Sequence, residues 1–103
     1  MYLGDLIEYL EDKDENIVVP IGLGEADSYR GYYEDLAFKP KANVTVKDML
    51  EEARNALGKT FRGYKGGEFE MTEYTRVWIS EYGTTHNSQR IGKLLLDYML
   101  NEL

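Results

Sequence analysis

The chain has 103 residues, a net charge of −7 and 43% hydrophobic side chains, which predicts one folded domain spanning residues 1–103. It contains no cysteine, which excludes disulfides and thiolate chemistry. No apolar run approaches the roughly 18 residues of a membrane-spanning helix, so no membrane contact is expected. The first ten residues lack the basic start and apolar stretch of a signal peptide, and we therefore expect a cytoplasmic location.

The negative charge is concentrated in the first half of the chain. Residues 1–58 hold 13 acidic and 6 basic side chains, whereas residues 59–103 hold 6 of each. General binding to DNA or RNA needs clustered lysine and arginine to displace counterions and is not expected. A small anionic ligand is compatible with this charge, because a few arginines and backbone amides act locally.

The chain begins with a predicted helix and strand. An apolar stripe at positions i, i+3, i+4 and i+7 predicts a helix over Leu3–Asp12, and its members are Leu3, Leu6, Ile7 and Leu10. The β-branched run Ile17–Ile21 predicts a strand, which Pro20 places at a sheet edge or near its own end. The glycine-rich segment Gly22–Ser28 is predicted to be a loop.

A second strand is predicted over Tyr29–Phe38, followed by a loop at Lys39–Ala42. Alternation would put one set of side chains on one face, namely Arg30, Tyr32, Glu34, Leu36 and Phe38. Thr45 with Asp48 resembles a capping box, and Gly58 suits a helix C-terminus. Together with the spacing of the apolar residues between them, these signals predict a helix over residues 46–57.

The second half alternates short elements. Phe61–Glu68 is predicted as a turn or irregular hairpin, Phe69–Met71 as a short strand and Thr75–Tyr82 as a longer one. After a loop at Gly83–Asn87, Asn87 or Ser88 would cap a last helix carrying Ile91, Leu94, Leu95, Tyr98 and Met99. The predicted fold class is α+β, with an antiparallel or mixed sheet of three to four strands and three helices packed on it.

No catalytic motif in the sequence occurs in the structural context that its chemistry requires. Gly58–Thr60 resembles part of a phosphate loop but follows a helix instead of opening one, and Gly22–Gly24 lacks the third glycine of a dinucleotide fingerprint. His86, which is the only histidine, has no orienting partner in sequence. We therefore expect a binding protein without enzymatic activity, cofactor or metal.

Two segments repeat the order aromatic, arginine, glycine, tyrosine: Tyr29–Tyr33 and Phe61–Gly67. Rings stack on bases, guanidinium groups hydrogen-bond phosphates and glycine exposes backbone amides, which suits a nucleotide-like ligand. The competing interpretation is that these aromatics serve packing or subunit contact.

A further cluster comes from the end of a strand, its loop and the expected start of the last helix, and its members are Trp78, Thr84, Thr85, Asn87 and Arg90. The candidate ligand-binding residues from all these segments are Arg30, Tyr32, Arg62, Tyr64, Lys65, Trp78, Thr84, Thr85, Asn87 and Arg90. A helix N-terminus in this cluster could hold an anion, although for any single residue the pattern favours ordinary helix capping by Asn87 or Ser88.

The stretches Ser28–Phe38, Val44–Val46 and Gly63–Phe69 resemble small proteins of tailed bacteriophages. Phage proteins of this size often counter host defence. In size and in its content of arginine, aromatic and glycine residues the chain is similar to anti-Thoeris sponges, oligomers that sequester cyclic ADP-ribose-type signals and, in some members, cyclic oligonucleotides. The resemblance implies a homo-oligomeric anti-defence protein that acts in the host cytoplasm.

Two functional hypotheses follow. In the first, the protein sequesters a cyclic nucleotide or cyclic ADP-ribose-type signal without cleaving it. In the second, its acidic first half mimics nucleic acid and inhibits a nuclease or CRISPR effector. A metal-dependent nucleotide hydrolase is a weaker third reading, because neither Glu34–Asp35 nor Glu51–Glu52 has the spacing of a known metal motif.

Overall fold

The computed structural model describes residues 1–29, 32–62, 66–80 and 88–101, with the side chains of residues 32 and 33 excepted. Its elements in chain order are α1 (Leu3–Glu11), β1 (Val18–Tyr29), β2 (Tyr32–Thr45), α2 (Val46–Ala56), β3 (Thr60–Arg62), β4 (Glu68–Glu70), β5 (Val77–Ser80), β6 (Ser88–Arg90) and α3 (Lys93–Met99). None of the helices in the described ranges is long and apolar enough to cross a membrane.

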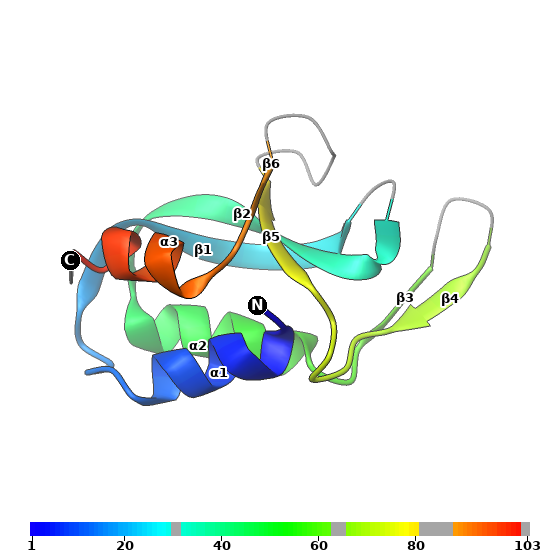
Figure 1. The fold of residues 1–103 in the computed structure, drawn as a ribbon, viewed down its shortest axis with the longest axis horizontal. Coiled ribbons are helices and arrows are strands. Elements are labelled where there is room, and N and C mark those ends of the chain that lie inside the picture. The colour runs from blue at the N-terminus through cyan, green and yellow to red at the C-terminus, as the bar shows by residue number, and fades with distance from the viewer. Residues whose placement is uncertain (30–31, 63–65, 81–87, 102–103) are drawn as a thin grey trace.

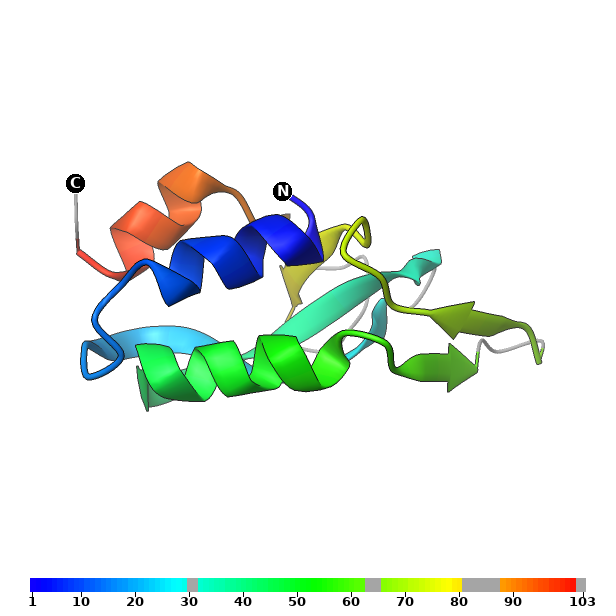
Figure 2. The same cartoon turned by 90° about the horizontal axis from the view of Figure 1, so that it is seen from below.

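The main sheet has four strands in the order β1-β2-β5-β6 (Figure 1). β1 pairs with β2 and β5 pairs with β6 in antiparallel fashion, whereas β2 and β5 are parallel. β3 and β4 form a separate hairpin, which extends away from the main body at one end of the molecule (Figure 2). The predicted α+β class with a mixed sheet and three helices is confirmed.

The core lies between the sheet and the two longer helices. α1 and α2 lie side by side along β1 and β2 (Figures 1 and 2), while α3 packs beside β1. Each layer contributes fully buried side chains, among them Leu6, Leu23, Phe38, Met49 and Val77. These apolar residues form one connected cluster, which holds the helices against the sheet.

The start of α2 follows the predicted capping box. The Asp48 amide donates to Thr45 Oγ1 at 3.1 Å, and the Thr45 amide donates to the Asp48 carboxylate at 3.0 Å. The hydrogen bond from the Thr45 backbone amide to the carboxylate, followed by one from the Thr45 side chain, lowers the pKa of Asp48, because both favour its charged form. Gly58 adopts a φ of 84°, as its predicted role after the helix requires.

The first hairpin corrects three predictions. Gly22–Ser28 and Lys39–Ala42 are strand rather than loop, and the chain reverses after Tyr29 instead of continuing as one strand to Phe38. Gly22 serves packing here, since an added Cβ would lie 2.5 Å from Val44 and 2.8 Å from Met49. The register of the pairing shifts between Leu23 and Ala26, where residues 24 and 25 form a bulge. The sequence pattern did not predict this bulge.

Two further features of this hairpin concern its prolines. Pro20 lies in β1, which is an edge strand, the first of the two predicted alternatives, and the strand continues past Pro20 to Tyr29. Pro40 is accommodated in β2 because the pairing of β2 with β5 covers only Leu36–Phe38, which leaves one side of β2 open beyond that point.

The end of the chain also differs from prediction. Ser88–Arg90 forms β6 instead of opening a helix, and α3 begins only at Lys93, after Gly92. In this region Ile91, Leu96 and Leu100 are buried, and Leu95 and Met99 pack partly buried against the core. Two of the apolar residues that the predicted helix carries are exposed, Leu94 at 74% and Tyr98 at 71%.

Candidate functional site

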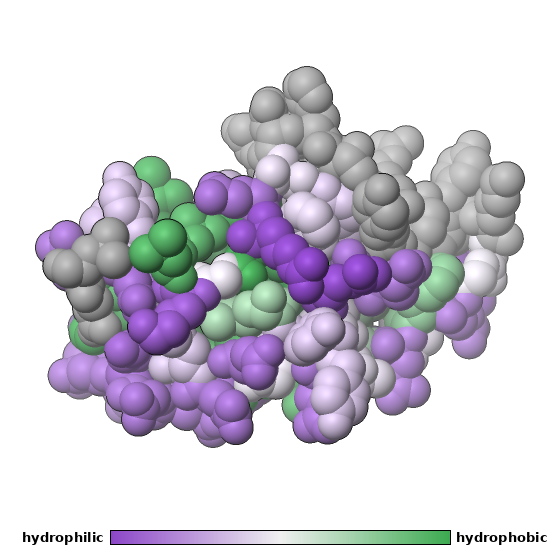
Figure 3. Space-filling model, in the orientation of Figure 1, coloured by the Kyte–Doolittle hydropathy of each residue, from purple (hydrophilic) through white to green (hydrophobic). Residues whose placement is uncertain are grey.

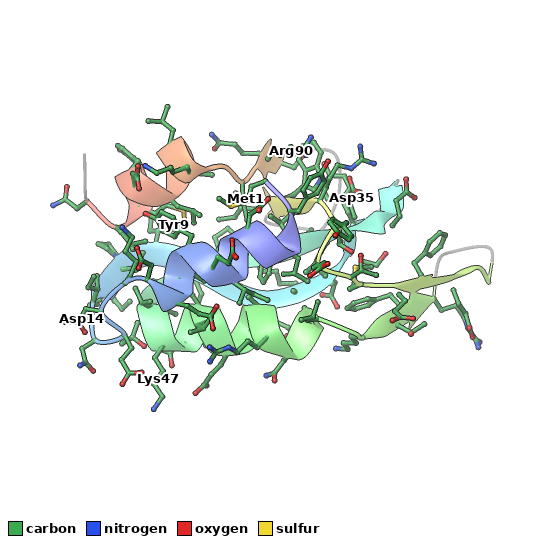
Figure 4. The ribbon with its side chains drawn as sticks, turned by 60° about the horizontal axis from the view of Figure 1, so that its bottom comes forward. Met1, Tyr9, Asp14, Asp35, Lys47 and Arg90 are labelled. Atoms are coloured by element: carbon green, nitrogen blue, oxygen red, sulfur yellow. The ribbon has the colours of Figure 1, made fainter. Side chains whose placement is uncertain are left out.

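Pairing of β5 with β6 brings two predicted ligand-binding residues together. Arg90 lies directly opposite Trp78, and Ser88 lies opposite Ser80. Cross-strand partners in an antiparallel pair project from the same face of a sheet, so the indole and the guanidinium share one surface. Figure 4 shows Arg90 on β6 and Asp35 on β2.

Trp78 is fixed by a buried carboxylate. Asp35, which is only 3% exposed, accepts hydrogen bonds from Trp78 Nε1 at 2.9 Å and from Arg76 Nε at 3.1 Å. The Trp78 ring also lies 4.9 Å from the Tyr29 ring, and Tyr29 in turn shares a hydrogen bond with Ser88. The indole N–H is therefore committed to the fold, and the contacts orient β5 and β6.

A groove lies between β6 and α3. Its lining residues define what we call the β6–α3 groove: Gln89, Arg90, Gly92, Leu94, Leu95 and Tyr98. Its volume is about 590 Å³, within the range of roughly 300–1,000 Å³ that is typical of ligand sites. Figure 3 shows hydrophobic surface over α3 next to strongly hydrophilic surface over β6.

Arg90 is the charged group of this groove. It makes no ion pair or hydrogen bond with any other described residue, whereas Arg54, Arg62 and Arg76 are each paired with a carboxylate. The exposed Tyr98 ring supplies a flat surface on the same groove. A guanidinium and an aromatic ring are the groups that contact phosphate and base in nucleotide recognition.

Four other hollows in the described part of the chain have a different charge. One, of about 390 Å³, contains Glu34, Asp35 and Glu70 next to Arg76, and each of the remaining three contains at least two carboxylates. The described lining of the β6–α3 groove contains none. Of these five hollows, the β6–α3 groove is therefore the one whose described lining offers an anion a cation and no carboxylate.

Helix α3 is held in place by a polar contact with α1. The Tyr9 hydroxyl donates to Asp97 at 2.7 Å, and Lys93 Nζ donates to the same carboxylate at 2.9 Å. The hydrogen bond from Tyr9, followed by that from Lys93, lowers the pKa of the Asp97 carboxyl. Because Tyr98 follows Asp97 directly, this contact also helps to position the exposed ring.

Among the predicted residues whose side chains the structure describes, only Arg90 lines this groove, while Trp78 and Arg62 do not. Arg62 lies on β3 in the separate hairpin, 3.8 Å from the Glu68 carboxylate. Tyr32 begins β2, but its side chain is outside the described set. Six others fall in undescribed segments, namely Arg30, Tyr64, Lys65, Thr84, Thr85 and Asn87.

Sequence reasoning overlooked the contributions of Leu94 and Tyr98. The sequence pattern predicts both as apolar residues of the last helix and not as candidate ligand-binding residues. Gly92, followed by a lysine, was the available signal that the helix starts later, because glycine is acceptable at an N-cap while a helix interior disfavours it.

The described residues contain no group of three or more His, Cys, Asp or Glu side chains placed to hold a metal ion. Comparisons with protein-family models, curated proteins and solved structures find no match for this chain. The candidate site therefore rests on the contacts and charges described above.

Asp35→Asn should lower the free energy of unfolding by about 1–3 kcal/mol, because an amide cannot accept from both donors and presents its own N–H₂ to one of them. Chemical denaturation measures this change. Glu34→Gln is the matched control: its carboxylate lies 3.9 Å from Arg76 and is largely exposed, so its loss should change stability by less than about 0.5 kcal/mol. Equal effects of the two variants would contradict the bridging role of Asp35.

Acidification should weaken the attachment of α3. The pKa of Asp97 is lower in the folded chain, so its stabilising effect is complete above the ordinary carboxyl pKa and disappears as pH falls through the folded value. Wild type should therefore lose stability relative to Asp97→Asn below about pH 4. Thermal unfolding of both proteins between pH 6 and pH 2.5 tests this, and a difference that is constant with pH would contradict it.

Proposed function

We propose that this protein binds a nucleotide-like anion in the β6–α3 groove and sequesters it without cleavage. The observation that carries the proposal is the lone Arg90 guanidinium beside the exposed Tyr98 ring, in a groove whose described lining has no carboxylate. Sequestration requires affinity and abundance but no reacting group, so a groove that offers one cation and one aromatic ring meets its chemical requirements.

The affinity that sequestration needs is within reach of these groups. Micromolar binding corresponds to about 8 kcal/mol. A charge-assisted hydrogen bond contributes roughly 1.5–3 kcal/mol, and stacking of a base on an aromatic ring about 1–3 kcal/mol. Apolar contacts with Leu94 and Leu95, together with the ordered strand that carries Arg90, would provide the remainder.

The biological role that we propose follows from the resemblance to phage proteins. The bound molecule would be a cyclic nucleotide or cyclic ADP-ribose-type immune signal, captured in the host cytoplasm by a homo-oligomeric anti-defence protein. The backbone elements that carry the binding side chains, β6 and a helix attached to α1 through Tyr9 and Asp97, are held by the fold, which supports capture because little backbone entropy is lost on binding.

Arg90→Gln and Tyr98→Ala should each weaken binding at least 10-fold, which corresponds to about 1.4 kcal/mol. Isothermal titration against a panel of cyclic nucleotides and cyclic ADP-ribose measures the loss, with chromatography to show that the ligand stays intact. Arg54→Gln is the matched control, because Arg54 lies on α2 and pairs with Glu11 at 2.7 Å. Equal weakening by the Arg54 and Arg90 variants would exclude the groove as the site.

A second candidate function is supported by the distribution of charge. Residues 1–16 and 46–58, which contain the α1–α2 layer, hold nine of the 19 acidic residues and three of the 12 basic ones. On α1 and its C-cap, Asp5, Glu8 and Asp12 are exposed at spacings of three and four residues, which costs helix stability through like-charge repulsion. Such a surface fits the basic groove of a nuclease or CRISPR effector.

The double variant Glu8→Gln/Asp12→Asn should abolish protection of a phage from host defence if this acidic surface is the inhibitor. Plaque formation on defence-positive cells that express each variant is the measurement, with at least a 10-fold drop expected. Glu25→Gln/Glu70→Gln removes two carboxylates outside the α1–α2 layer and should retain protection. Loss of protection with Arg90→Gln, but not with the α1 variant, would instead favour sequestration.

A further inference from the structure

We infer that a groove at the start of α1 is a docking site for an arginine-bearing segment of a partner protein. This groove, which we call the tyrosine groove, has a volume of about 350 Å³ and an apolar and aromatic surface formed by Tyr2, Ile7, Leu57 and Tyr74. It shares no described lining residue with the β6–α3 groove, so the inference goes beyond nucleotide capture and does not depend on it.

Two tyrosine rings lie together at this groove. Tyr74 is 72% exposed and Tyr2 is 45% exposed, and their ring centroids lie 6.4 Å apart in an edge-to-face arrangement. Leu57, which lines the same groove, is also exposed. Tyrosine is enriched among the residues that contribute most to protein interfaces, because its ring buries a large apolar area while its hydroxyl keeps a polar partner.

The turn that carries Tyr74 is held against the start of α1 (Figure 2). The Leu3 amide donates to the Thr75 carbonyl at 2.7 Å, and the Gly4 amide donates to the Glu73 carbonyl at 2.9 Å. An added Cβ at Gly4 would lie 3.1 Å from Glu73, so the glycine permits this close approach. The backbone that carries the Tyr74 ring is therefore positioned by the fold, which lowers the entropy cost of docking.

The charge of the groove determines the charge of its partner. Asp5, Glu8 and Glu73 belong to the described lining, which contains no lysine or arginine. Each of the other three acidic hollows in the described ranges contains at least one basic side chain. The tyrosine groove is thus the acidic hollow among them whose described lining leaves the negative charge without a cation.

The polar contacts of these carboxylates are local and do not neutralise them. Asp5 accepts from the Tyr2 amide at 2.9 Å. A hydrogen bond with Glu73, followed by the charge of that carboxylate, raises the pKa of Tyr74. Neither Asp5, Glu8 nor Glu73 forms an ion pair with a described residue.

An arginine side chain matches both the apolar surface and the charge of the groove. Its stem packs on apolar side chains, its guanidinium stacks on aromatic rings, and its N–H groups donate to carboxylates. The tyrosine groove offers all three kinds of partner, in Leu57, the two tyrosine rings and the glutamates. The same charge repels an anionic partner such as a nucleic acid.

An NMR titration of the backbone amides with two synthetic peptides tests this docking site. The probe is the acetylated peptide Ala-Arg-Leu-Gly-Arg-Leu-Ala, and its counterpart has glutamine at both arginine positions. At low ionic strength the arginine peptide should shift amides of residues 2–8, 57 and 72–75, and the glutamine peptide should bind at least about five-fold more weakly. Equal binding of the two peptides, shifts spread over the whole acidic surface, or no binding at all would overturn the inference.

Matched variants locate the binding to the groove. Tyr74→Ala should weaken binding of the arginine peptide at least about five-fold, whereas Tyr98→Ala, which removes an equally exposed ring from α3, should not change it. Glu8→Gln/Glu73→Gln should weaken it more than Glu15→Gln/Glu51→Gln, which removes the same charge from other exposed positions.

Amide shifts that are unchanged away from the substituted side chains show that each variant is folded. Equal losses from the two tyrosine variants, or from the two double variants, would exclude the tyrosine groove as the site. Failure of every nucleotide to bind would overturn sequestration in the β6–α3 groove and leave this docking site intact.

Discussion

The buried carboxylate of Asp35 is the contact on which the second half of the fold depends. It lies on β2 and accepts from two side chains of β5, Arg76 and Trp78. Only three residue pairs join β2 to β5 in register, so backbone pairing alone holds these strands weakly. A charge-assisted bridge across that short parallel segment fixes β5, and β5 fixes β6 through the pairing of Trp78 with Arg90.

This dependence extends to the candidate site. Ser88 is tied to Tyr29, whose ring lies against Trp78, so β6 is connected to the first hairpin as well as to β5. Arg90 ends β6, and α3 begins three residues later with its own attachment to α1 through Asp97. The two walls of the β6–α3 groove are therefore positioned by separate polar contacts, β6 through Ser88 and α3 through Asp97.

The sequence was most informative where one short segment determines the structure. Thr45 and Asp48 cap α2 in a pattern that depends on four residues, and Leu3, Leu6 and Leu10 align on one helix face; both features were predicted correctly. Gly22 was misread because its role depends on Val44 and Met49, which approach it only after the hairpin and α2 have packed. A local pattern contains no information about such neighbours.

The candidate site was predicted only in part for the same reason. Arg90 and Trp78 were both identified, but their direct pairing depends on a β6 strand that the sequence presented as the start of a helix. Leu94 and Tyr98 are apolar and four residues apart, so the sequence alone does not distinguish them from residues that face the core. In the fold the core is reached by Ile91, Leu96 and Leu100 instead.

The pairing of charges gives the strongest argument that the groove is a site rather than ordinary surface. Of the four arginines whose side chains the structure describes, Arg54, Arg62 and Arg76 each have a carboxylate within 4.0 Å. In a chain with 19 acidic residues such partners are easy to find, yet Arg90 has none in the described structure and lies beside apolar side chains instead. A guanidinium in that setting attracts an anion more strongly than one already neutralised by a neighbour, because no internal carboxylate competes for its donors.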